Sequence, residues 1–247
     1  LAFIRAIFII GKIEKGALMK TIGLIGGMSW ESSSLYYSII NREVRRLLGK
    51  SHSASCIMYS FDFQGIEEKQ YAGQWEELEA EMVEAGLRLK SAGADFIVLC
   101  TNTMHKLMDR FEEKVGLPFL HIADVAAESM KEDGLSAIGL LGTKFTMGED
   151  FYKKRIHERY GLTVLVPDDN DQEEVNRIIY KELVRGIVKE ESRKKYEEII
   201  DRLVERGAQG IILGCTEIGI LIKEHRCPLY DTTLIHALKA ARMSVQG

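Results

Sequence analysis

The chain has 247 residues, of which 46% are hydrophobic and 28% charged, and only three are proline. This composition excludes disordered, collagen-like and coiled-coil proteins, and the length suffices for one large domain or two lobes. The 33 Lys and Arg residues and the 37 Asp and Glu residues give a formal net charge of −4, which excludes the strong basic excess of most nucleic-acid-binding surfaces.

The first eighteen residues are expected to lie outside the fold. Residues 1–10 are mostly apolar but contain Arg5, and they are too few for a membrane span, which needs about 20 apolar residues. They also lack the basic start and the small-residue cleavage site of a signal peptide. Met19 stands directly before a clean strand pattern. We therefore interpret residues 1–18 as an N-terminal extension and expect no membrane partner.

From Met19 onward the apolar pattern alternates between the strand period and the helix period. Strands are predicted at residues 21–25, 55–60 and 96–99, and helices at residues 32–48 and 75–92. Regular alternation of this kind is typical of an α/β fold, in which βαβ units form a parallel sheet and ligands bind at the carboxyl ends of the strands.

The same order of segments occurs twice along the chain. Residues 22–26 (IGLIG) return as 138–142 (IGLLG), residues 93–101 (GADFIVLCT) as 207–215 (GAQGIILGC), and residues 117–121 (LPFLH) as 227–231 (CPLYD). We therefore predict two pseudo-symmetric lobes, each with a parallel β-sheet flanked by helices, and an active site between them. Residues 19–117 and 228–247 would form the first lobe, and residues 118–227 the second.

The four cysteines are Cys56, Cys100, Cys215 and Cys227, and no two of them have the C-x-x-C spacing of a metal or redox site. Reduced thiols are the default in the cytoplasm, which is the location that we expect. Cys215 follows a predicted buried strand and precedes two polar residues, Thr216 and Glu217. Backbone N–H groups at such a strand end favour a thiolate, so we expect a chemical role for Cys215, with an inert buried cysteine as the alternative.

Residues 100–105 (CTNTMH) place several polar or reactive groups after the equivalent strand of the first half. In the repeat, Thr101 stands opposite Cys215, whereas side-chain alternation directs Cys100 to the other face. Cys100 is therefore either a second reactive group or a core residue. Asn102 and Thr103 can donate hydrogen bonds to a carboxylate, and His105 is expected at a helix start rather than as a ligand.

A glycine-rich segment ends the first predicted strand, with Gly23, Gly26 and Gly27 before Met28. The G-x-G-x-x-G spacing of a dinucleotide loop is absent. Backbone N–H groups at the following helix start could hold a carboxylate, with a phosphate as the alternative.

Three segments together resemble the cofactor-independent aspartate/glutamate racemase family: residues 19–28 (MKTIGLIGGM), 100–105 (CTNTMH) and 214–219 (GCTEIG). The resemblance runs from Met19 to near the C-terminus. It implies two pseudo-symmetric α/β lobes, activity without pyridoxal phosphate or metal, and two acid–base residues on opposite sides of the substrate α-carbon. Both are usually cysteines in that family. Here Thr101 takes the first position, which resembles the subgroup that acts on acidic amino acids with some preference for the L-enantiomer.

The resemblance also implies the site residues and the partners. Thr101 and Cys215 would be catalytic, and the substrate contacts would be Met28, Gln70, Thr101, Asn102, Thr103, Thr216 and, by a looser match, Glu182. The ligand would be a small acidic amino acid, with no cofactor and no metal, and the chain would form a homodimer. A hydantoin racemase, a maleate isomerase and a non-catalytic amino-acid-binding protein remain alternatives, the last because Thr101 replaces a thiol.

Overall fold

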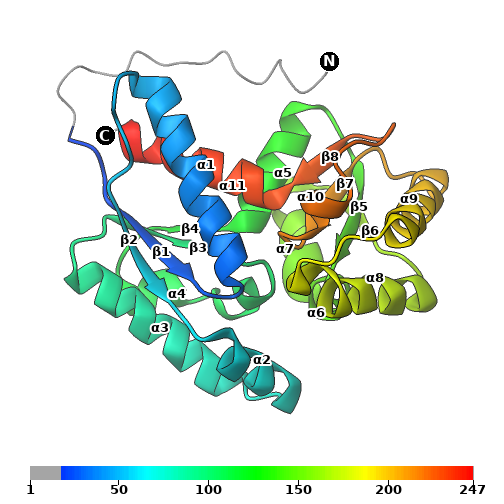
Figure 1. Cartoon of the computed structure of the whole chain (residues 1–247), viewed down its shortest axis with the longest axis horizontal. Coiled ribbons are helices and arrows are strands. Elements are labelled where there is room, and N and C mark those ends of the chain that lie inside the picture. Colours follow the sequence, from blue (N-terminus) through cyan, green and yellow to red (C-terminus); the bar gives the residue numbers. More distant parts are fainter. Residues whose placement is uncertain (1–17, 247) are drawn as a thin grey trace.

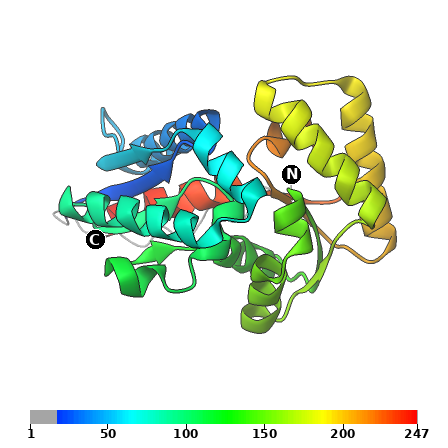
Figure 2. The ribbon, with the colours of Figure 1, turned by 90° about the horizontal axis from the view of Figure 1, so that it is seen from below.

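The computed structural model describes residues 18–246, so the predicted N-terminal extension lies outside the described residues except for Leu18. Two four-stranded sheets form two lobes, and helices flank each sheet (Figure 1). Figure 2 shows the lobes side by side, with the first half of the chain in one and the yellow and orange segments in the other. The predicted two-lobed α/β architecture is confirmed.

The first sheet has the strand order β2-β1-β3-β4, and all neighbouring strands run parallel. Every residue of β1 and β3 is buried, as expected of central strands that are covered on both faces. Helix α1 begins at Trp30, two residues before the predicted start, because the Ser29 side chain caps it by accepting a hydrogen bond from the Ser32 N–H (3.3 Å). The elements of this part of the chain are β1 (Ile22–Gly26), α1 (Trp30–Leu48), β2 (Cys56–Ser60), α2 (Phe63–Ala72), α3 (Trp75–Ser91), β3 (Phe96–Leu99), η2 (Thr103–Leu107), α4 (Phe111–Val115) and β4 (Phe119–Leu120).

The second sheet repeats the plan of the first, with the parallel order β6-β5-β7-β8. The strands β5, β6, β7 and β8 therefore correspond to β1, β2, β3 and β4, as the sequence repeat predicts. The remaining elements are α5 (Ile122–Glu132), β5 (Ala137–Gly142), α6 (Lys144–Gly148), α7 (Asp150–Tyr160), β6 (Thr163–Leu165), α8 (Asp169–Lys181), η3 (Leu183–Arg185), α9 (Glu190–Glu205), β7 (Ile211–Gly214), α10 (Ile218–Leu221), β8 (Leu229–Asp231) and α11 (Thr232–Val245).

The chain crosses between the lobes twice. The first crossing follows β4: Leu120 packs against a core cluster of the first lobe, and Ile122 already belongs to the core of the second. The second crossing follows β8, because Tyr230 lies in the core of the second lobe and Ala237 of α11 in that of the first. The lobe limits at 117/118 and 227/228 stay predictions. β4 comes directly after the first of these limits but pairs with the first sheet, and β8 comes directly after the second but pairs with the second sheet.

Within residues 18–246, no helix is both long and apolar enough to cross a membrane. The expected cytoplasmic location stays a prediction.

Candidate active site

A small cavity lies between the lobes, at the carboxyl ends of four strands. The loops that follow β1, β3, β5 and β7 all contribute to its wall, which is where ligands bind in parallel α/β sheets. The centre of a water molecule can occupy about 40 Å³ of it, enough for a few waters and matched to a small ligand rather than a nucleotide. The lining residues are Met28, Ser29, Phe63, Gln70, Thr101, Asn102, Thr103, Thr143, Ile179, Tyr180, Val184, Gly214, Cys215, Thr216 and Glu217.

The structure brings most of the predicted site residues together. Thr101 and Cys215 enter the cavity from the ends of β3 and β7, which are equivalent strands of the two lobes. Cys100 is fully buried in the core between β3 and α1 and does not line the cavity. The expected opposite orientation of Cys100 and Thr101 therefore corresponds to what is seen.

The environment of Cys215 differs from the expected one. Burial raises the pKa of its thiol well above the ordinary value, and the negative charge of Glu217 and a hydrogen bond to it raise the pKa further. The backbone N–H groups of Glu217 and Thr216 act in the opposite direction, but they are outweighed. The resting group is thus a thiol rather than the predicted thiolate, and its Sγ–H donates to Glu217 Oε2 at 3.0 Å.

Glu217 is a member of the site that the sequence did not identify as a site residue. Its side chain is 7% exposed and accepts three hydrogen bonds. These come from Cys215 Sγ (3.0 Å), Thr216 Oγ1 (2.5 Å) and Ser29 Oγ (3.1 Å). The Cys215 contact makes Glu217 Oε2 the nearest acceptor for the thiol proton, and the hydrogen bonds from Thr216 and Ser29 hold the carboxylate in place.

Asn102 has an unpaired acceptor beside the amide donor that we expected. Its amide Nδ2 donates to Thr232 Oγ1 at 3.1 Å, and the single hydroxyl proton of Thr232 is already donated to Leu213 O at 2.8 Å. Thr232 can therefore only accept, which fixes the orientation of the Asn102 amide. Its Oδ1 is buried and has no partner among the described residues, so it suits an incoming ammonium group.

Thr103 lies at one end of a chain of three hydroxyl groups. Thr103 Oγ1 lies 3.1 Å from Thr143 Oγ1, which lies 3.1 Å from Thr146 Oγ1. If the chain runs from Thr146 to Thr143 to Thr103, each of the first two protons has an acceptor and the last one is free for a ligand. The reverse direction would leave the buried Thr146 proton without a partner among residues 18–246.

Thr143 was missed as a site residue, although the repeat carried the signal. The copy of residues 22–26 at 138–142 aligns Thr143 with Gly27. Gly27 itself does not line the cavity, and its N–H donates to Ser33 Oγ (2.8 Å), so it cannot hold a carboxylate as proposed from the sequence. It has a φ of 88°, and a Cβ there would lie 2.2 Å from Phe61 O, so only glycine fits.

Of the other predicted contacts, Met28, Gln70 and Thr216 line the cavity, and Glu182 does not. Glu182 is buried behind the wall, where it accepts from Ser192 (2.6 Å) and pairs with Arg177 (3.0 Å). The sequence missed the apolar part of the wall: Phe63, Ile179, Tyr180 and Val184.

Aromatic contacts join the lobes beside the cavity. Tyr71 of α2 packs against Phe145 of α6 and Tyr180 of α8, with ring centroids 6.4 and 6.0 Å apart. Among the described residues, no group of His, Cys, Asp and Glu side chains could hold a metal ion.

Comparison with known proteins agrees with this architecture. Residues 25–240 match the family model described as Asp/Glu/Hydantoin racemase. A solved structure of a putative Asp/Glu racemase from Yersinia pestis is 50% identical, with a TM-score of 0.87 over 92% of this chain and 100% of that one. An aspartate racemase homologue from Pyrococcus horikoshii OT3 is 35% identical, with a TM-score of 0.80 over 92% and 99%. The broad specificity amino-acid racemase RacX of Bacillus subtilis is 21% identical over 86% of this chain and 92% of its own length.

Proposed function

The chain belongs to the Asp/Glu/hydantoin racemase family, and on that premise we propose that it interconverts the L- and D-enantiomers of aspartate or glutamate without pyridoxal phosphate. One observation carries the proposal. Thr101 and Cys215 reach the same small cavity from equivalent strand ends of two pseudo-symmetric lobes. A substrate α-carbon between them has one proton-transfer group on each face, which inversion by two bases requires.

In the proposed reaction the α-hydrogen leaves as a proton and a new proton arrives on the opposite face. Cys215 first loses its thiol proton to Glu217, and the thiolate then takes the α-proton, so the C–H bond breaks and an S–H bond forms. The electron pair of the C–H bond delocalises into the carboxylate. The Thr101 hydroxyl protonates the carbon from the other side, which forms the mirror image and leaves an alkoxide on Thr101. Solvent carries the proton held by Glu217 back to Thr101, so that the carboxylate, the thiol and the hydroxyl are all restored. In the reverse direction the two residues exchange roles.

The geometry supports particular contacts to an amino acid. The buried, unpaired Oδ1 of Asn102 would accept from the α-ammonium group, and the free hydroxyl proton of Thr103 would donate to a carboxylate. Donors that are already in place when charge develops on the carboxylate stabilise the transition state without reorganisation. Because no Lys or Arg lines the described cavity, the second carboxylate of an acidic substrate would be bound by hydroxyl and backbone N–H groups.

The test is to incubate the purified protein with each enantiomer of aspartate and of glutamate and to follow enantiomeric composition by chiral chromatography. We expect at least one of the four compounds to approach an equal mixture from either enantiomer. Binding of an acidic amino acid, measured by calorimetry, with no change in enantiomeric composition would instead identify a binding protein.

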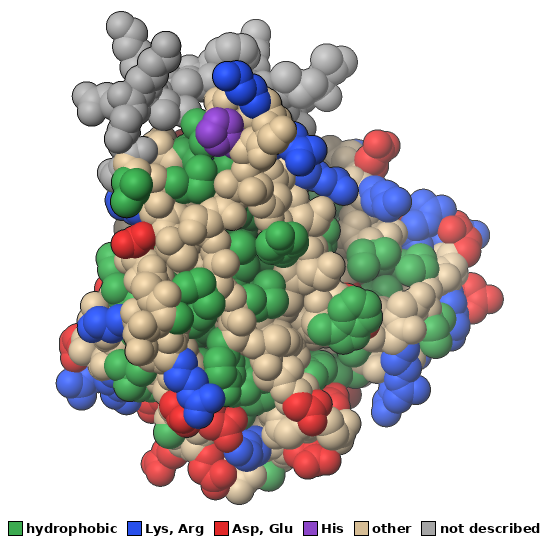
Figure 3. Space-filling view, turned by 60° about the vertical axis from the view of Figure 1, so that its left-hand side comes forward, with side chains coloured by type: hydrophobic (Ala, Val, Ile, Leu, Met, Phe, Trp, Pro, Cys, Tyr) green, Lys and Arg blue, Asp and Glu red, His purple; other side chains and the backbone are tan. Residues whose placement is uncertain are grey.

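We also propose a homodimer. Trp30, Leu35 and Tyr37 of α1 and Ile220 of α10 are large, apolar and exposed, and Leu35 and Ile220 line one groove. Figure 3 shows few charged side chains across the middle of the face that carries α1. In a two-fold contact each patch meets its own copy, and exposed apolar side chains are then buried against one another. The groove is also lined by Glu31 and Glu217. Light scattering should give twice the chain mass for the unmodified protein and the mass of one chain for Tyr37→Glu. The mass of one chain for the unmodified protein would contradict the proposed homodimer.

A further inference from the structure

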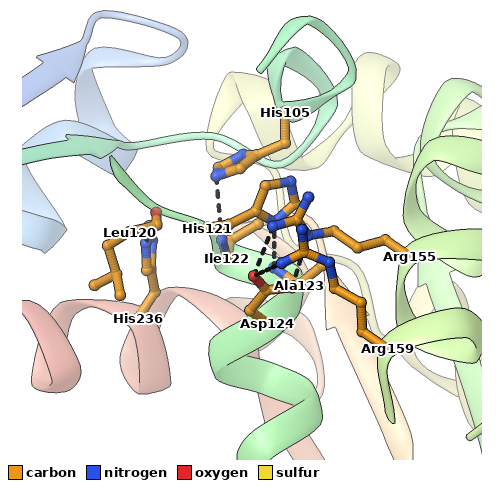
Figure 4. A network of polar contacts seen from close by, with 9 residues as sticks. All are labelled: His105, Leu120, His121, Ile122, Ala123, Asp124, Arg155, Arg159 and His236. Carbon is orange, nitrogen blue, oxygen red and sulfur yellow. Dashed lines mark hydrogen bonds and ion pairs between the residues drawn. The ribbon is translucent and has the colours of Figure 1, made fainter. Parts of the chain in front are cut away.

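Three buried histidines lie together at the first crossing between the lobes (Figure 4). His105 belongs to η2, His121 caps α5, and His236 belongs to α11. The ring centroid of His105 lies 4.7 Å from that of His121 and 5.9 Å from that of His236. The mechanism above uses none of them, although His105 closes the same short motif that contains Thr101.

The contacts of His105 determine which of its ring nitrogens carries the proton. The Ile122 N–H donates to Nε2 at 3.2 Å, so Nε2 is an acceptor and carries no proton. Burial lowers the pKa of His105 well below its ordinary value, so the ring is neutral. The proton is therefore on Nδ1, which donates to the backbone carbonyl of Thr101 at 2.8 Å.

Residues on both sides of Ile122, which His105 contacts, are held in place. His236 Nε2 lies 2.9 Å from Leu120 O, directly before the crossing between the lobes. Directly after the crossing, Asp124 forms two 2.6 Å hydrogen bonds with Arg155 of α7, which belongs to the second lobe. Residues 120–124 are thus fixed from both lobes, and His105 connects them to the strand end that carries Thr101.

The link has no counterpart on the Cys215 side. In the repeat that aligns Thr101 with Cys215, His105 aligns with Gly219, which has no side chain. The carbonyl of Cys215 accepts only from the N–H of Ile218, at 3.1 Å, among the described residues. Whatever His105 does for proton transfer therefore acts on one face of the substrate only.

We propose that His105 is a positioning residue for Thr101: its Nδ1–H holds the Thr101 carbonyl against the crossing between the lobes and so fixes the hydroxyl relative to the substrate. This rests on the proposed racemase function. A displacement of about 1 Å in a reacting group can lower its rate about a hundredfold. Loss of the Nδ1 donor should therefore slow proton transfer at the Thr101 face and spare the Cys215 face.

Two neutral substitutions separate the two contacts of the ring. His105→Gln can place an amide oxygen near the Nε2 position and keep the acceptor for Ile122, but it loses the Nδ1 donor. His105→Asn keeps an amide donor near the Nδ1 position and is the matched conservative variant. In D₂O, exchange of the α-hydrogen is followed by NMR and inversion by chiral chromatography, starting from each enantiomer.

For the enantiomer that faces Cys215, removal of the α-proton does not need Thr101, but inversion does. The intermediate can return through Cys215, whose proton is shared with Glu217, and Glu217 also lines the groove between α1 and α10. In His105→Gln the ratio of exchange to inversion should rise at least about tenfold for one enantiomer, and His105→Asn should restore it. An unchanged ratio for both enantiomers in His105→Gln would overturn the proposal, because a general loss of structure slows both processes together.

A measurement on the unmodified protein tests the link without any variant or activity. In protein labelled with ¹⁵N-histidine, the nitrogen chemical shifts of His105 distinguish the two neutral tautomers. We expect the Nδ1–H form, and the Nε2–H form would overturn the proposal. Because this result does not depend on turnover, it separates a failure of this inference from a failure of the proposed racemase function.

Discussion

Acid should destabilise this fold through His236, and the structure gives the size of the effect. The side chain is fully buried, with Nδ1 2.8 Å from the Tyr36 hydroxyl and Nε2 2.9 Å from Leu120 O. Burial lowers the pKa of His236 from 6.5 to about 4. Protonation would leave both ring nitrogens as donors, so the Tyr36 hydroxyl would lose its acceptor.

The difference in proton binding between the folded and unfolded chains gives the direction and the size of the change in the free energy of unfolding. Between pH 6.5 and pH 4 the unfolded chain binds the proton and the folded chain does not, so the free energy of unfolding decreases as the pH falls through this range. Below about pH 4 both states are protonated and the loss is complete. At about 1.4 kcal/mol per pKa unit, the full loss is about 3 kcal/mol, of which about 2 kcal/mol has occurred at pH 5.

Urea denaturation at pH 7 and pH 5 measures this contribution. His236→Gln keeps a donor for Leu120 O but cannot titrate, so its free energy of unfolding should fall by about 2 kcal/mol less between the two pH values than that of the unmodified protein. His52 is exposed, and His52→Gln is the matched control that should leave the difference unchanged. The reasoning is refuted if His236→Gln loses as much stability as the unmodified protein, whatever its absolute stability.

Three further predictions concern activity. Cys215→Ala should lower the rate of racemisation by a factor of about 10²–10⁴, the usual contribution of a positioned proton-transfer group. Cys100 lies in the core behind the same cavity, so Cys100→Ala should keep the activity within about threefold and lose only stability. Glu217→Gln should lower kcat by a factor of about 10²–10⁴, because no carboxylate is left to accept the thiol proton of Cys215; an unchanged kcat would show that Glu217 is not the acceptor of this proton. Dialysis against EDTA and treatment with hydroxylamine should leave activity intact, and a large loss in either would reveal a metal or a carbonyl cofactor.

The pairing of the two proposed catalytic residues could be predicted because it depends on topology. The repeated segments imply equivalent strands, and equivalent strands in two facing lobes bring Thr101 and Cys215 to one cavity. Side-chain alternation along one strand likewise sufficed to place Cys100 in the core. Both inferences need only the period and the order of the elements, which the amino-acid pattern carries.

The electrostatics of the site could not be predicted, because they depend on contacts between distant residues. Local backbone N–H groups suggested a thiolate at Cys215, but burial by the surrounding fold outweighs them. The unpaired acceptor of Asn102 depends on Thr232, 130 residues away, which orients the amide by accepting from its Nδ2. Glu182 was expected in the site from a looser match to the family, and only the fold reveals that Ser192 and Arg177 occupy its carboxylate.

The two halves of the chain make equivalent contacts across the interface between the lobes, but they place different chemical groups in the cavity. In each half, the third residue of the strand-end motif bonds to a helix-capping residue of the opposite lobe: Thr103 to Thr143, and Glu217 to Ser29. These two matched contacts hold Thr101 and Cys215 on opposite sides of the cavity, as the proposed inversion of an α-carbon needs. The groups they present are unlike, a hydroxyl on one side and a thiol with its own carboxylate on the other. Because enantiomers have equal free energies, kcat/KM must be the same in both directions, so this chemical difference can appear only in kcat and KM separately.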